Sequence, residues 1–94
     1  MEGPLKLVAV RWSRKDRPVL VYAHPTGARV LHRVGRYGTL TMLEAFRALG
    51  LNNNVRLYRM KARGELKTVK VKGRACVRVS ELRRLRRMFS REAA

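Results

Sequence analysis

The chain has 94 residues, which is enough for one folded domain with a modest core and too short for two. Its 23 lysines and arginines against 6 aspartates and glutamates give a formal net charge of +17, which favours a polyanionic partner, nucleic acid first. Hydrophobic residues make up 46% of the chain, and this content excludes a disordered basic tail.

The composition also disfavours a secreted protein or a membrane protein. Cys76 is the only cysteine, so no disulfide can form within the chain and a reducing compartment is the natural setting. No apolar run approaches the ~20 residues of a membrane span. We therefore expect a cytoplasmic, nucleoid-associated protein with no membrane partner.

Three strand-like runs are expected in the first 38 residues, at 5–12, 18–24 and 29–34. The stretches between them are short and polar or carry proline and glycine, which predicts an antiparallel meander. Trp12 and Tyr22 have the ring faces that stack on bases, but burial against the helices is the favoured interpretation.

A first helix is predicted after Thr41. Thr41 and Glu44 have the spacing of a capping box, in which each side chain satisfies the backbone N–H of the other residue. Leu43, Phe46 and Leu49 recur at helical spacing and predict one apolar face. Gly50 is expected to end this helix.

A second helix is predicted over about 54–63, after a turn formed by the three asparagines 52–54. Arg56, Arg59 and Arg63 are spaced by three and four residues, which places them on one helix face. Leu57 and Met60 lie on a neighbouring face and are expected to dock on the first helix. Such an arginine stripe is often merely solvated, and only the flanking elements favour a role in binding.

A basic hairpin is predicted over about 69–79, with Lys72, Gly73 and Arg74 at its tip. Ser80 is a suitable N-cap for a last helix. Leu82, Leu85 and Phe89 form one apolar stripe of that helix, and arginines fill most of the remainder.

The segment of about residues 40–85 resembles the excisionase-type helix-turn-helix domains, which are related to the MerR winged-helix group. The matching stretches are LTMLEAFRALGL, YRMKARGEL and VKVKGRACVRVSEL. The chain departs from the family pattern by a turn one residue longer, by asparagine at the start of the second helix, and by Lys67 where proline is common.

The resemblance implies a winged helix-turn-helix over residues 39–94. With the antiparallel β-meander that the strand-like runs predict over 1–38, packed on the same domain, the expected fold class is α+β. The second helix would enter the major groove of double-stranded DNA, and the hairpin would be a wing at the minor groove or backbone. The DNA-binding candidates are Asn54, Arg56, Tyr58, Arg59, Arg63, Lys70, Lys72 and Arg74.

The N-terminal strands are not part of the family pattern. The sequence leaves open whether they extend the sheet of the wing or provide a dimerisation surface, and so it is compatible with a homodimer.

No catalytic, metal or cofactor site is predicted. His24 and His32 are eight residues apart with no cysteine or acidic cluster near them. No two of the 6 acids have a recognisable catalytic spacing, and Cys76 has no histidine partner in any motif, so an enzyme is the least favoured class.

The expected function is sequence-specific binding of double-stranded DNA, as a small transcriptional regulator or an excisionase-like architectural factor. Two alternatives stay open. One is an RNA- or ribosome-associated basic protein, and the other is a chromatin protein that binds any duplex without sequence preference.

Overall fold

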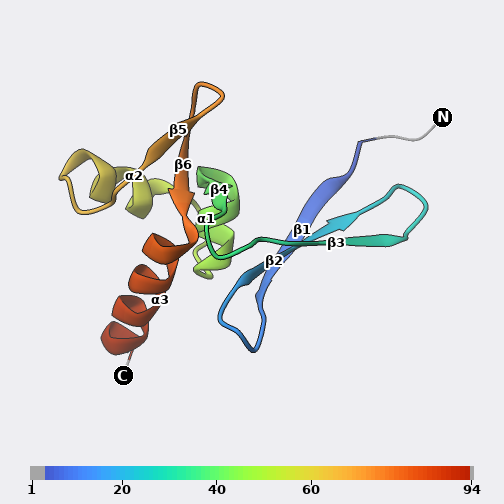
Figure 1. Ribbon diagram of the computed structural model, residues 1–94, viewed down its shortest axis with the longest axis horizontal. Helices are drawn as coiled ribbons and strands as arrows, with labels where there is room; N and C mark the ends of the chain where they lie inside the picture. Colours follow the sequence, from blue (N-terminus) through green and yellow to red (C-terminus); the bar gives the residue numbers. More distant parts are fainter. Residues whose placement is uncertain (1–3, 94) are drawn as a thin grey trace.

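The computed structural model describes residues 4–93 and has an α+β fold (Figure 1). Two three-stranded sheets and three helices follow one another in the order β1-β2-β3-β4-α1-α2-β5-β6-α3. Their bounds are β1 Lys6–Trp12, β2 Pro18–Ala23, β3 Arg29–Arg33, β4 Thr39–Thr41, α1 Met42–Ala48, α2 Val55–Ala62, β5 Val69–Val71, β6 Arg74–Arg78 and α3 Val79–Ala93.

The first sheet is the antiparallel meander that the sequence predicts, in the order β1-β2-β3. Proline at position 18 begins β2, where its missing N–H costs the sheet little. Asp16 adopts a positive φ of 58° in the β1–β2 turn, a conformation that aspartate tolerates better than most residues. This sheet does not extend the second one, so the proposal of a widened wing sheet is wrong.

The second sheet has the order β4-β6-β5, with both pairs antiparallel. The sequence predicts the hairpin but not β4, which is only three residues long. Lys72 and Gly73 connect β5 to β6, and their φ values of 52° and 80° are those of a tight two-residue hairpin turn. The hairpin projects beyond the helices (Figure 1).

Helix α1 begins with the predicted capping box. The Thr41 hydroxyl accepts the Glu44 N–H at 3.2 Å, and the Glu44 carboxylate accepts the Thr41 N–H at 2.9 Å. The inward face is formed by Met42, Ala45 and Ala48, whereas Leu43 is 50% exposed. The expected apolar face was therefore wrong at Leu43, because the core contacts the face of α1 formed by Met42, Ala45 and Ala48 and leaves Leu43 outside.

Both α1 and α2 end in the same hydrogen-bond pattern, at Gly50 and Gly64. Each glycine has a positive φ, at 72° and 76°. After α1 the N–H of Leu51 donates to the Phe46 carbonyl at 3.0 Å, and after α2 the N–H of Glu65 donates to the Met60 carbonyl at 2.8 Å. These bonds satisfy carbonyls that a helix end leaves open, which explains why both helices stop at glycine.

One hydrophobic core joins the elements. It contains Leu40, Leu57, Val77, Leu82 and Leu85, all fully buried, and from the first part of the chain Leu20 and Val34. Leu57 and Met60 are buried as the sequence predicts, and Phe89 packs on the core from the stripe of α3. Helix α3 begins at Val79, so Ser80 lies inside its first turn rather than at its N-cap.

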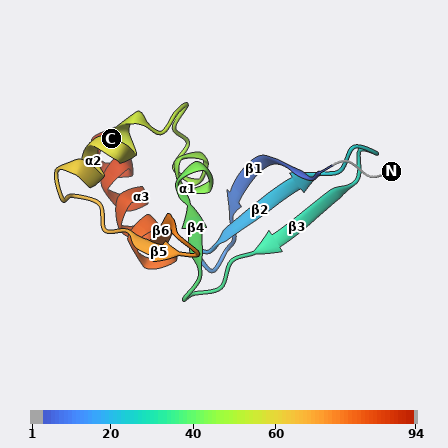
Figure 2. The same ribbon diagram turned by 90° about the horizontal axis from the view of Figure 1, so that it is seen from above.

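The meander is attached to the helices on the side of α1 (Figure 2). The Trp12 Nε1–H donates to the Ala48 carbonyl at 2.8 Å, and the Tyr22 hydroxyl donates to the Glu44 carboxylate at 2.9 Å. Trp12 and Tyr22 are thus packed against the core, as expected. Burial and the neighbouring Glu44 carboxylate raise the pKa of Tyr22.

Asp16 provides a second attachment, to α3. Its carboxylate pairs with Arg86 at 2.5 Å, and its carbonyl accepts the Nε–H of Arg83 at 2.6 Å. The Arg86 guanidinium also lies over the Trp12 ring at 4.5 Å. Within residues 4–93, no helix has the length and apolarity needed to cross a membrane.

Candidate nucleic-acid interface

Helix α2 has a buried face and an exposed face. Leu57 and Met60 are 0% and 3% exposed and hold the helix on the core. Tyr58, 46% exposed, and Arg59 project from the opposite side, together with Val55. The exposed face therefore offers one cation and one aromatic ring to a partner.

Arg56 is placed differently from Arg59. Its Nη2–H donates to the Glu92 carboxylate of α3 at 2.5 Å, and its guanidinium lies 3.9 Å from the centre of the Phe89 ring. Arg56, Arg59 and Arg63 therefore do not form one free stripe. The spacing of residues within α2 could not predict this contact, because Glu92 lies 36 residues away in the sequence.

The two ends of α2 carry the remaining helix candidates. Arg63, the C-cap residue, lies 3.4 Å from the Glu65 carboxylate, and both side chains are more than half exposed. Asn54 is the N-cap residue, but its side chain makes no capping hydrogen bond. Instead the Asn53 side-chain oxygen accepts the Val55 N–H at 3.0 Å.

The hairpin holds the three other candidates, Lys70, Lys72 and Arg74, all exposed. Lys70 pairs with Ala75 and Arg74 with Val71, and adjacent residues of a strand point to opposite faces. Lys70 therefore lies on the sheet face shared with Leu40 and Val77, the face that packs against the helices, while Arg74 lies on the outer face. Lys72 stands at the tip between them.

The acids are distributed unevenly along this region. Residues 45–64 and 66–80 contain no aspartate or glutamate, yet each stretch contains 5 lysines and arginines. The carboxylates within residues 4–93 belong to Asp16, Glu44, Glu65, Glu81 and Glu92, and each has a hydrogen bond or ion pair inside the molecule. In this part of the chain, Arg59, Lys70, Lys72 and Arg74 have no ion-pair partner.

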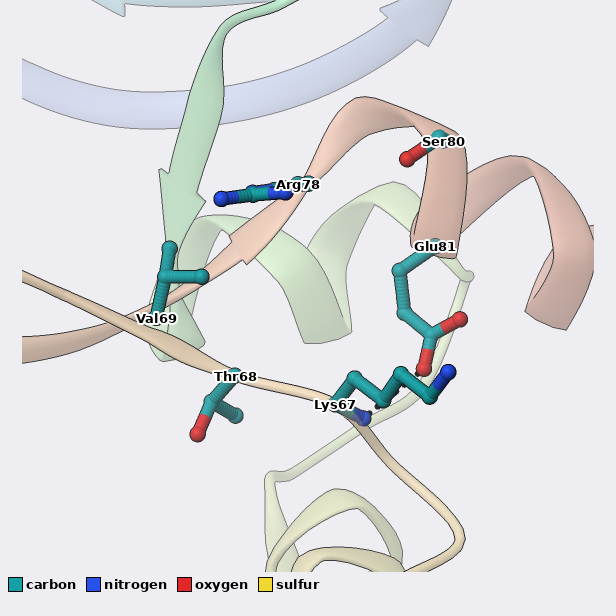
Figure 3. A pocket seen from close by; sticks show the side chains of 6 residues that line it. All are labelled: Lys67, Thr68, Val69, Arg78, Ser80 and Glu81. Carbon is teal, nitrogen blue, oxygen red and sulfur yellow. Dashed lines mark hydrogen bonds between the residues drawn. The ribbon is translucent and has the colours of Figure 1, made fainter.

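Glu81 fixes the base of the hairpin and is a residue that the sequence analysis did not single out. Its carboxylate accepts the Lys67 N–H at 2.8 Å and two N–H groups of Arg84 at 2.7 and 3.0 Å (Figure 3). Arg84 also donates to the Glu65 carbonyl at 2.9 Å. The hydrogen bonds from Arg84 lower the pKa of Glu81. Burial of the carboxylate acts in the opposite direction, and the hydrogen bond from the Lys67 N–H lowers the pKa further. In the sequence, only the Ser-Glu-Leu stretch shared with the excisionase-type domains pointed to Glu81, and it did not indicate this hydrogen-bonding role.

A pocket of about 590 Å³ adjoins this clasp and is lined by Arg78, Ser80 and Glu81 and by residues 67–69 (Figure 3). Arg78 lies over the outer face of the sheet there. Within residues 4–93, no group of three histidine, cysteine or acidic side chains lies close enough to hold a metal ion.

Comparisons with known proteins identify no relative: no family model, no curated protein and no solved structure matches this chain.

Proposed function

We propose that this protein binds double-stranded DNA, with β4, α1, α2 and the β5–β6 hairpin acting as a winged helix-turn-helix. The observation that carries the proposal is the absence of acids from residues 45–64 and 66–80, combined with exposed, unpaired cations on α2 and on the hairpin. This arrangement favours binding to duplex DNA, since each phosphate that a lysine or arginine neutralises releases counterions.

The connectivity supports the same proposal. A strand precedes the first helix and pairs with the second strand of the hairpin, and α2 follows α1 after a short turn. With α2 in the major groove, Arg59 would reach base edges, where a guanidinium recognises guanine through two hydrogen bonds. Tyr58 and Arg63 would contact the backbone on either side of it.

The hairpin would lie beside the groove. Lys72 at its tip and Lys70 on its helix-facing side would contact phosphates, and Arg74 would contact the backbone from the outer side. In this arrangement Arg56 holds α2 to α3 and reaches a phosphate only after leaving Glu92. Asn54, whose side chain is free of a capping bond, is available to a phosphate at the start of α2.

Selection of bound sequences from a random duplex pool, at near-physiological salt, tests the proposal. A sequence-specific regulator or excisionase-like factor gives an enriched motif. Binding without enrichment, together with a steep loss of affinity on adding salt, identifies a non-specific chromatin protein instead. A parallel competition with structured RNA at the same salt decides the partner, and a preference for RNA contradicts the proposal.

A further inference from the structure

The outer face of the second sheet carries a trough that the proposed DNA contact reaches only at Lys70, Lys72 and Arg74. Its central pocket has a volume of about 690 Å³, which lies within the range of small-ligand sites. Val69 and Arg78 line both this pocket and the neighbouring one beside Glu81. Thr39 and Val71 line both it and a third pocket, of about 450 Å³, toward Arg74. The shared residues place the three pockets side by side across the sheet, and this row of pockets is the trough.

The central pocket is basic. Arg36, Arg78 and Arg83 contribute to its lining, as does Lys70, whose side chain belongs to the opposite face of the sheet. None of its lining residues is an acid. In the described part of the chain Arg36 and Arg78 have no ion-pair partner. Glu44 and Glu81 line only the two outer pockets, and both are engaged by hydrogen bonds within the protein.

Tyr37 stands at the rim of this pocket and is 90% exposed. It lies in a tight turn closed by the Gly38 N–H, which donates to the Gly35 carbonyl at 2.9 Å. The Gly38 carbonyl accepts the Val79 N–H at 3.1 Å, which ties the turn to the start of α3. A Cβ atom at position 38 would lie 2.5 Å from the Val34 side chain, so glycine is required there. The turn thus holds an aromatic ring out of the core and beside the cations.

We propose that this trough binds an unpaired strand of DNA, with a base stacked on Tyr37 and its phosphates held by Arg36 and Arg78. Cations that follow the backbone, combined with an exposed aromatic ring, are the features of single-strand sites. The interior of a duplex is excluded from this contact because stacking between neighbouring base pairs covers the ring faces of its bases. The choice of DNA over RNA rests on the proposed function.

The trough and the proposed duplex contact are separable. Arg78 and Thr39 pair across the outer face of the sheet, whereas Leu57 and Met60 hold α2 on the core side. Figure 2 shows the turn before β4 and helix α2 on opposite sides of the second sheet. Variants at Tyr37 and Arg78 therefore leave Arg59 of α2 intact, whereas Lys70, Lys72 and Arg74 adjoin both surfaces.

The test measures binding of the full chain to a labelled, non-self-complementary DNA strand of about 8 nucleotides, and to a blunt duplex. Tyr37→Ala should weaken binding of the single strand about ten-fold, and Tyr37→Phe should preserve it. Because Tyr37 is almost fully exposed, neither change should affect folding. Arg78→Gln should lower the slope of log single-strand affinity against log salt concentration by about 0.7. The matched charge control, Arg91→Gln on α3, should leave this slope unchanged.

Duplex affinity gives the independent readout. It should be unchanged by Tyr37→Ala and reduced by Arg59→Ala, which should leave single-strand binding unchanged. If Tyr37→Ala leaves the single-strand affinity within about two-fold of the parent, no base stacks on Tyr37 and the proposal is overturned. It is also overturned if a mononucleotide or an RNA strand of the same sequence binds more tightly than the DNA strand. Failure of the duplex to bind, with these single-strand results intact, contradicts only the proposed duplex function.

Discussion

Arg56 and Glu92 form an ion pair between α2 and the end of α3, with Nη2 and Oε2 2.5 Å apart. Both side chains are about half exposed, at 44% and 51%. An exposed pair of this kind adds no more than about 1 kcal/mol to the free energy of unfolding. Its larger consequence is that one cation of the proposed DNA-binding helix is neutralised within the protein.

Glu92→Gln should therefore strengthen DNA binding. The change removes a negative charge and releases Arg56 for a phosphate, which should steepen the dependence of log affinity on log salt by about 0.9. Fluorescence anisotropy of a labelled duplex over a range of salt concentrations measures this slope. The double variant Arg56→Gln with Glu92→Gln is the control, and its slope should not exceed that of the parent. An unchanged slope for Glu92→Gln alone would show that Arg56 does not reach the backbone.

Substitution of Arg59 and substitution of Lys72 should have different effects on the sequence preference of DNA binding. Arg59→Ala removes the cation on the exposed face of α2, and should cost about 1–3 kcal/mol on the preferred sequence and relax the preference at one base pair. Lys72→Ala removes a cation at the hairpin tip and should weaken binding evenly on all sequences. Binding to a panel of single-base variants of the selected site separates the two. Equal losses on every sequence from both variants would remove Arg59 from base recognition.

Glu81 should make stability depend on pH in the acidic range. Because its pKa is lowered in the folded state from the ordinary 4.5, it contributes stability that is fully present above that value. The contribution is lost as pH falls through the lower pKa of the folded state. Glu81→Gln should thus cost about 2 kcal/mol at pH 7, since the hydrogen bonds to Arg84 are charge-assisted. It should cost much less at a pH low enough to protonate the Glu81 carboxylate of the folded protein.

Denaturant unfolding of parent and variant at several pH values checks this window. Glu65→Gln is a matched control, because its ion pair with Arg63, at 3.4 Å, joins side chains that are 52% and 61% exposed. Its effect should be below about 0.5 kcal/mol at every pH. A Glu81→Gln difference that does not shrink with falling pH would show that the side chain acts by packing rather than by charge.

Replacing Lys72 with glycine should affect stability and DNA binding in different ways. A non-glycine residue with a φ of 52° is strained by about 1 kcal/mol, and glycine relieves that strain. Lys72→Gly should therefore preserve or raise the denaturation midpoint while weakening DNA binding as much as Lys72→Ala does. Circular dichroism on denaturation and duplex titration measure the two properties. A destabilised Lys72→Gly variant would mean that the lysine side chain supports the hairpin.

Local interactions were predictable from the sequence. The capping box at Thr41, the glycine ends of α1 and α2, and the antiparallel meander each depend on residues close together in the chain. The burial of Leu57 and Met60 followed from helical spacing alone. Strand β4 was missed because three residues carry too little periodicity. Leu43 was misplaced because α1 has apolar residues on two neighbouring faces, and tertiary packing buries the one with Met42, Ala45 and Ala48.

Long-range pairing of charges was not predictable. Asp16 reaches Arg86 across 70 residues, and Glu92 reaches Arg56 across 36. Spacing places arginines on a helix face but does not tell which of them meets a carboxylate from another element. With so few acids, each such pair decides which cations stay available. The sequence therefore supplies candidate residues but does not tell which of their charges are paired within the protein.

The first 38 residues should be needed for folding of the remainder. Leu20 and Val34 are 3% and 5% exposed and belong to the same core as Leu40 and Leu57. Each buried leucine that is lost costs about 2–5 kcal/mol, against a total stability of about 5–15 kcal/mol for a domain. A fragment of residues 39–94 should lack cooperative unfolding, and Leu20→Ala in the full chain should lower the denaturation midpoint clearly. Leu31→Ala, at a residue 60% exposed, should change it little. Cooperative unfolding of the fragment at the parent's midpoint would mean instead that the meander is an appendage, attached by Trp12 and Tyr22 but not part of the core.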